Sequence, residues 1–319
     1  MKRLLTLILT GSLFVTPALA AGSSVETSFP AVREPVSFSD VAQDRWYADA
    51  AGLCYETGLM NGTGDGTFSP DVMVTTAEAA TLAARIHHIL NGGDGVLPEA
   101  PADWGQITVT REDGVTLSLY SSASTGFWVN DREINSLYLT VDDSWKAYDG
   151  QTVTLEMNGS TYSGTFRYVL GAYGLTPAFQ LGQVSQETYD QYYEDLWTAL
   201  AWPAPGVWYR NTACYLDTVL DTDELGRLTD TATRLTFAKA LKLVSGDLLE
   251  PINDITTFPD CEDDWKDTVL PLYQAGILSG VDASGAFRPN GQLSRAEMAA
   301  MAARLIRPAL RLHFSLENG

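Results

Sequence analysis

Apolar residues in two widely separated parts of the chain follow a helical period. Over residues 46–57 they recur at three- and four-residue spacing, which predicts an amphipathic helix. A glycine-rich turn follows, and a second helix is predicted to begin after Thr75, because Glu78 stands three residues later in capping-box spacing. Ser294 and Glu297 repeat this spacing near the C-terminus. Both parts are therefore expected to fold as helix, loop, helix.

Between these parts the pattern changes from a helical period to strict alternation. Residues 97–183 contain short alternating segments rich in β-branched and aromatic residues, separated by Asp-Gly and Asn-Gly turns. The expected strands are 106–110, 115–120, 136–141, 151–157 and 161–170. They predict a small antiparallel β domain, followed by an acidic, aromatic helix over 185–201 that ends at a Trp-Pro-Ala-Pro sequence. The fold class expected is α+β.

The two helical parts are copies of one another. Their shared landmarks are, in order, Phe-x-Asp, Trp, Gly-x-x-x-Gly, Phe-x-Pro and Thr/Ser-x-Ala-Glu, over residues 38–92 and 257–310. A degenerate copy over 205–250 keeps Trp208 and the Thr-Arg pair ending at Arg234 but lacks the Gly-x-x-x-Gly and Phe-x-Pro landmarks. We expect all three copies to pack together, because one helical pair cannot bury its apolar face alone.

These motifs resemble surface-layer homology (SLH) repeats. The resemblance is strong over the first and last copies and weak over the middle one, and it does not extend to the β domain. It implies a pseudo-threefold all-α bundle of three helix-loop-helix SLH repeats, interrupted by the β domain. It also implies grooves between repeats that bind secondary cell-wall polysaccharide, a peptidoglycan-linked polymer, and so attach the protein to the wall without a covalent bond.

The resemblance also indicates which residues would bind the polymer. The arginine of the Thr-Arg-Ala-Glu motif suits a carboxylate or pyruvate group on a sugar, because its guanidinium makes paired hydrogen bonds. Thr76 replaces this arginine in the first copy, so that groove is expected to lack the charged contact. The expected polymer-binding residues are Arg295, Arg234, Asp260, Asp40, Trp265, Trp46 and Glu297.

Several of these residues have a structural alternative. Glu297 is also placed to cap its own helix. Asp40 and Asp260 are as suited to ordering a loop as to contacting a ligand. The tryptophans of the three copies are favoured as core residues over sugar platforms. They are Trp46, Trp208 and Trp265.

The N-terminus and the charge indicate where the protein acts. A basic start, a short apolar run and the small residues up to Ala20 have the organisation of a secretory signal peptide over residues 1–20, and residues 21–37 are expected to form a flexible leader. No other segment approaches the roughly 18 consecutive apolar residues of a membrane helix. The net charge of −20 disfavours nucleic acid and anionic membranes but is compatible with carbohydrate.

No catalytic or metal-binding motif is found in the sequence. The loop from Asn61 begins like a calcium loop, but Val72 occupies the position that requires a bidentate glutamate. The adjacent His87 and His88 point to different sides of a helix. Three cysteines do not form a disulfide framework, and unpaired buried cysteines are favoured over a single pair. We expect no cofactor, no metal and no enzymatic activity.

The sequence thus predicts a secreted protein of the bacterial cell wall that is held by its SLH repeats and displays a small β domain. The alternative is a structural scaffold that is derived from SLH repeats, has lost polymer binding and contacts a surface protein partner through the β domain or the helix at 185–201. Thr76 and the shortened middle copy favour this alternative.

Overall fold

The structure, a computed structural model, describes residues 25–120, 136–171 and 174–316. The chain separates into two compact units that are each described by themselves. The first contains residues 1–74, 82–96 and 231–319, and the second contains 75–81 and 97–230. The expected signal peptide at 1–20 lies outside the described residues.

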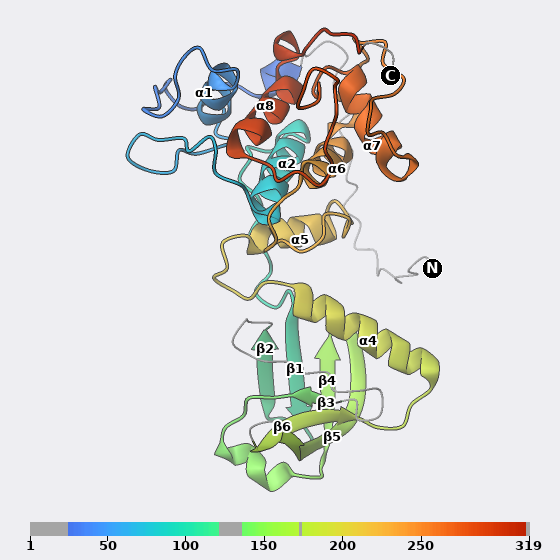
Figure 1. Cartoon of the computed structure of the whole chain (residues 1–319). Coiled ribbons are helices and arrows are strands. Elements are labelled where there is room, and N and C mark those ends of the chain that lie inside the picture. Colours follow the sequence, from blue (N-terminus) through green and yellow to red (C-terminus); the bar gives the residue numbers. More distant parts are fainter. Residues whose placement is uncertain (1–24, 121–135, 172–173, 317–319) are drawn as a thin grey trace. The chain divides into compact units, whose positions relative to one another are not determined.

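The first unit is helical (Figure 1). Its helices are α1 (Ala48–Glu56), the C-terminal part of α2 (Thr76–Leu90), α6 (Arg234–Ser245), α7 (Asp263–Gln274) and α8 (Arg295–Ile306). The α1 helix packs against α8, and α7 packs against α6. These contacts join the first copy to the last, and they join the last copy to α6.

Small side chains allow α1 and α8 to approach closely. Ala299, Ala302 and Ala303 of α8 are fully buried, and the thiol of Cys54 in α1 donates a 3.6 Å hydrogen bond to the carbonyl of Ala299. The alanines of the last copy therefore form a helix–helix interface. Their short side chains allow the backbones of α1 and α8 to lie close together.

Three backbone hydrogen bonds form a closed circuit in the first unit, which we call the closure ring. The Val74 amide donates to the Leu293 carbonyl at 3.0 Å, the Leu293 amide to the Ala232 carbonyl at 2.9 Å, and the Ala232 amide to the Val74 carbonyl at 2.8 Å. These residues lie shortly before α2, α6 and α8. The ring thus brings together the segments that lead into these three helices.

The leader is packed against the first copy over part of its length. Phe29 is buried, and the amides of Val32 and Arg33 both donate to the carbonyl of Glu56 at the end of α1. The last copy has the same arrangement, since two consecutive amides, at residues 252 and 253, donate to the carbonyl of Gln274 at the end of α7. Within the expected leader, Phe29, Val32 and Arg33 therefore pack against the first copy.

The second unit contains a curled antiparallel sheet of six described strands. These are β1 (Gln106–Arg111), β2 (Thr116–Tyr120), β3 (Ser136–Tyr138), β4 (Thr152–Met157), β5 (Ser160–Gly171) and β6 (Gly174–Leu181). The strand order is β2-β1-β4-β5-β6-β3. The long β5 pairs with β4 through its first half and with β6 through the remainder, where Gly164 and Thr165 pair on both sides.

Alternation in the sequence accounts for the core of this sheet. Every second residue of β1 and of β4 is buried, in the period of two that places one face of a sheet inside. The helix α4 (Gln186–Ala201), capped by Ser185, covers this core with Tyr192, Leu196 and Ala199. The sequence pattern predicts α4 and five of the strands, but it does not predict β6. This strand contains Pro177, and proline is usually excluded from central strands.

Candidate functional site

Arg295, expected at a polymer-binding groove, binds the loop of the first copy. It is the first residue of α8, its side chain is buried, and its Nε donates to the carbonyl of Phe68 at 2.9 Å. A terminal nitrogen donates to the carbonyl of Asn61 at 2.7 Å, and the guanidinium lies 5.0 Å from the centre of the Phe68 ring. The motif arginine of the last copy therefore holds the turn of the first.

Arg234 repeats this arrangement between the start of α6 and the loop of the last copy. It begins α6, is buried, and its Nε donates to the carbonyl of Phe287 at 2.7 Å, while the guanidinium lies 5.3 Å from the centre of that ring. Its Nη1 forms an ion pair with Glu297. The two motif arginines thus perform the same contact with equivalent phenylalanines.

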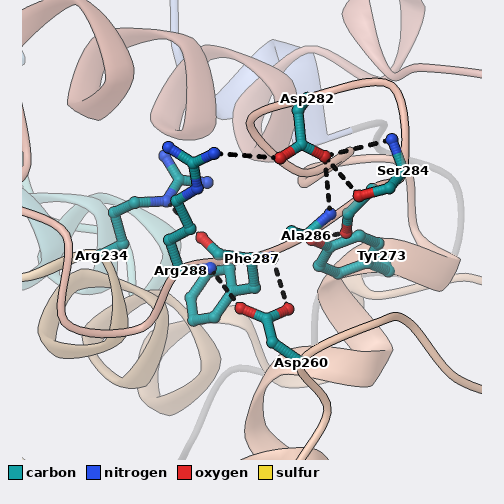
Figure 2. A network of polar contacts seen from close by, with 9 residues as sticks. Arg234, Asp260, Tyr273, Asp282, Ser284, Ala286, Phe287 and Arg288 are labelled. Carbon is teal, nitrogen blue, oxygen red and sulfur yellow. Dashed lines mark hydrogen bonds and ion pairs between the residues drawn. The ribbon is translucent and has the colours of Figure 1, made fainter.

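Asp260 orders the loop to which Arg234 binds, as Figure 2 shows. Its carboxylate accepts hydrogen bonds from the amides of Phe287 at 2.7 Å and Arg288 at 2.6 Å. Arg288 has the left-handed backbone angle φ = 57°, which costs a residue with a Cβ conformational energy. Asp282 contacts the same loop from the other side and forms an ion pair with the Arg288 side chain at 3.2 Å.

Asp40 makes the same contact in the first copy. It accepts from the amides of Phe68 at 2.8 Å and Ser69 at 2.7 Å, and Ser69 has φ = 58°. Desolvation is the largest influence on the Asp40 pKa and raises it, but the backbone hydrogen bonds and the charge of Arg295 outweigh it, so the pKa lies below the ordinary 3.8. Both aspartates therefore order loops, one of the two roles considered for them.

The capping role expected of the motif glutamates is confirmed. Glu297 accepts from the backbone amide of Ser294 at 2.9 Å, and its own amide donates to the Ser294 hydroxyl at 3.3 Å, which completes a capping box. Glu78 and Thr75 form the same pair of contacts. Glu297 differs in also binding Arg234, so it links a helix cap to a neighbouring copy.

The tryptophans divide into two environments. Trp265 is 6% exposed and packs against the rings of Phe258 and Phe287, as expected of a core residue. Trp46 is 61% exposed and Trp208 is 63% exposed, so the core interpretation is wrong for these two. Each lies edge-on to the tyrosine that follows it, with ring centroids 5.2 Å apart for Trp46 and 5.4 Å apart for Trp208. The two exposed tryptophans therefore have the same local packing.

Thr76, which replaces the motif arginine, is buried in the second unit. Its amide donates to the carbonyl of Asp230 at 2.8 Å, and the amide of Ala77 donates to the carbonyl of Leu228 at 2.9 Å. In the first unit the first two amides of α6 and of α8 bind carbonyls two residues apart in the same way. The backbone contact persists at residue 76 although the guanidinium is absent.

A turn at Pro101 resembles the opening turn of the outer copies. The amide of Trp104 donates to the carbonyl of Pro101, three residues earlier, at 3.0 Å. In the first copy the amide of residue 41 donates to the carbonyl of residue 38, and in the last copy the amide of residue 261 donates to the carbonyl of residue 258. The sequence Pro-Ala-Asp-Trp carries an aspartate at the matching place, a signal that sequence analysis missed.

Arg210, also missed by sequence analysis, joins this turn to the start of α5 (Arg210–Thr218). Its buried guanidinium donates to the carbonyls of Pro203 at 2.6 Å, Pro101 at 3.0 Å and Trp104 at 2.6 Å. Trp104 stacks on Trp202 with ring centroids 4.7 Å apart. The backbone that enters the β domain and the backbone that leaves α4 are therefore held side by side.

Residues 25–120, 136–171 and 174–316 contain no cluster of His, Cys, Asp and Glu side chains arranged to hold a metal ion. None of the described helices combines the length and the apolar character needed to span a bilayer.

Comparison with known proteins adds one finding to this geometry. The chain matches the family model of the S-layer homology domain over residues 37–80 and 257–299. Curated proteins and solved structures give no match. The matched segments contain Asp40 and Asp260 with the loops they order, and the second includes Arg295. Two segments of the chain therefore match S-layer homology domains, a family of non-catalytic modules that bind cell-wall polymers, and the match points to a place at the bacterial cell surface.

Proposed function

We propose that this protein is exported and held at the cell wall by secondary cell-wall polysaccharide, which binds at its SLH repeats, and that it displays the β domain. The match of two S-layer homology domains carries this proposal. The shared loop geometry around Asp40 and Asp260 supports it, because both domains keep the same ordered surface.

We further propose a division of labour among the expected site residues. Arg234 and Arg295 position the loops between copies, since their guanidinium groups bind backbone carbonyls of the next copy. The exposed ring of Trp46 contacts the polymer, because a large aromatic surface facing water suits a sugar ring and contributes little to the core. Asp40, Asp260, Trp265 and Glu297 then act by holding this surface in shape.

The proposal includes a three-copy, pseudo-threefold bundle in which the β domain is an insertion. The closure ring and the helix contacts between copies support the bundle. The turn at Pro101 and the junction at Arg210 support a middle copy that begins near residue 97, is interrupted by residues 105–201, and resumes before Trp208. Replacing 105–201 with a short Gly-Ser linker should leave a folded helical protein, and loss of cooperative unfolding would contradict the insertion.

Sedimentation with purified cell walls tests polymer binding. The full chain should sediment with walls that retain their secondary polymer and stay in solution with walls stripped of it. Trp46→Ala should weaken sedimentation without changing the melting temperature, because the side chain is exposed. Val96→Ala, at a position that is also exposed, is the matched control. Equal sedimentation with stripped walls would contradict the proposal.

The buried motif arginines favour a second candidate, a scaffold that has lost polymer binding. The guanidinium groups of Arg234 and Arg295 bind backbone carbonyls of neighbouring copies, and Thr76 has no guanidinium group that could bind the polymer. In this case the intact chain would stay in solution with polymer-bearing walls, and it would contact a protein partner at the cell surface instead. Thr76→Arg separates the two candidates further, since it should strengthen sedimentation only where the first groove still receives polymer.

A further inference from the structure

The helix α4 carries a row of aromatic rings on its outer side. Tyr189, Tyr193 and Trp197 follow at four-residue intervals, which places them on one face of the helix. The ring centroids of the first two are 6.1 Å apart and nearly parallel at 24°, and those of the second and third are 5.9 Å apart at 71°. The three rings therefore run along one side of α4, and Tyr189 packs partly against the core of the β domain.

Two rings of this row, Tyr193 and Trp197, lie outside the core of the β domain. Tyr192, Leu196 and Ala199 on the other side of α4 are buried and supply its contact with the sheet. Tyr193 is 37% exposed and Trp197 is 53% exposed. Two neighbouring large rings that face water without being needed for packing indicate a surface that binds something.

Carboxylates run alongside the rings. Asp190 and Glu194 are exposed and stand four residues apart, and the Gln186 side chain donates a 2.7 Å hydrogen bond to Asp190. The sequence of α4 contains no lysine or arginine to neutralise them. The face therefore repels polyanions and attracts groups that are positively charged.

We propose that this aromatic and acidic face of α4 binds a glycan strand that carries free amino groups, of the glucosamine type. The apolar face of a sugar ring lies on Tyr193 and Trp197, and each ammonium group is attracted by the aromatic faces and by the carboxylates of Asp190 and Glu194. A wall location, indicated by the S-layer homology domains, supplies glycan strands in abundance. The proposal rests on this wall location, but α4 lies outside the two matched segments, so its test does not require that they bind polymer.

Titration calorimetry of the full chain with two defined oligosaccharides tests this proposal. The glucosamine hexamer should bind at a pH where its amines are protonated, and the N-acetylglucosamine hexamer should bind at least about tenfold more weakly, because it lacks the charges. Equal binding of both hexamers, or no binding of either at millimolar concentration, would overturn the proposal. A hexalysine peptide that binds as tightly as the glucosamine hexamer would overturn it in favour of a basic protein partner.

Three variants locate the binding on α4. Tyr193→Ala combined with Trp197→Ala should reduce affinity for the glucosamine hexamer by about tenfold or more, the loss expected for two cation–π contacts. Asp190→Asn combined with Glu194→Gln should remove the preference over the acetylated hexamer. Trp208→Ala, equally exposed but outside α4, should bind as the parent does. Circular dichroism verifies folding, and unchanged affinity in both α4 variants would overturn the assignment.

Discussion

The Nε of Arg295 donates a hydrogen bond to the carbonyl of Phe68, a residue 227 positions earlier in the chain. Arg234 makes the equivalent bond to Phe287, over a separation of 53 residues. An arginine expected to receive the ligand thus serves to bind the copies to one another. Buried guanidinium groups are well suited to this, because one side chain satisfies several carbonyls.

Replacing Arg295 should destabilise the helical unit. Arg295→Ala removes two charged hydrogen bonds and leaves the carbonyls of Phe68 and Asn61 without that donor, so the free energy of unfolding should fall by about 2–4 kcal/mol. Urea denaturation measures the change. Arg288→Ala is the control, since its side chain is 65% exposed and its ion pair should contribute less than about 1 kcal/mol. Equal losses in the two variants would show that Arg295 does not bridge the copies.

Arg234 and Glu297 should be energetically coupled. The pair is largely withdrawn from water, so a double-mutant cycle with Arg234→Ala and Glu297→Gln should give a coupling energy of about 1–3 kcal/mol. The exposed pair of Lys146 and Asp143 should give a coupling close to zero in the same experiment. A cycle in which the two pairs behave alike would argue against the ion pair as a link between copies.

Acid should remove the contribution of Asp40. Its folded-state pKa lies below the ordinary value of 3.8, so the stabilisation is fully present above that value and is lost as the pH falls through the folded-state pKa. Asp40→Asn should therefore lower the free energy of unfolding by at most about 1 kcal/mol at neutral pH, because solvent screens this exposed carboxylate, and by less once the pH falls below 3.8. Asp44→Asn, at an exposed position, is the control. A difference that does not change with pH would contradict this role.

The thiols should differ in reactivity. Burial raises the pKa of Cys54 to about 12, whereas Cys261 is only half-buried. Because the thiolate is the reactive form, iodoacetamide near pH 8 should label Cys261 and leave Cys54 unmodified until the protein unfolds. Mass spectrometry of digested peptides measures the two sites. Labelling of Cys54 at the rate of Cys261 in the folded protein would show that α1 and α8 separate readily.

Sequence reasoning predicts the local elements well where a pattern lies within a short segment. The capping pair of Ser294 and Glu297, the helix α4 and the alternating strands β1 and β4 all follow from spacing alone. These features depend on neighbours a few residues away, which is the range over which periodicity carries information. The family match over residues 37–80 and 257–299 likewise depends on residue types and spacings within short segments.

Contacts between distant residues escape that reasoning. The sequence shows a charged motif at Arg295 but not that Phe68 lies beside it, and it offers no reason for Trp46 to be exposed while Trp265 is buried. The segment 205–250, expected as a degenerate copy, is a related case. Its Phe-x-Pro landmark is lost, yet the carbonyls of Leu228 and Asp230 bind the start of α2, because a backbone contact tolerates changes of side chain.

The closure ring gives the helical unit no free end. In a linear array of repeats, the terminal repeats have one neighbour each and fray first. Here Val74, Ala232 and Leu293 each donate to one of the other two and accept from the remaining one, so none of the three segments that they join is terminal. Opening any copy breaks contacts on both of its sides. The unit should therefore resist local fraying and stepwise proteolysis, and lose its structure in a single all-or-none event.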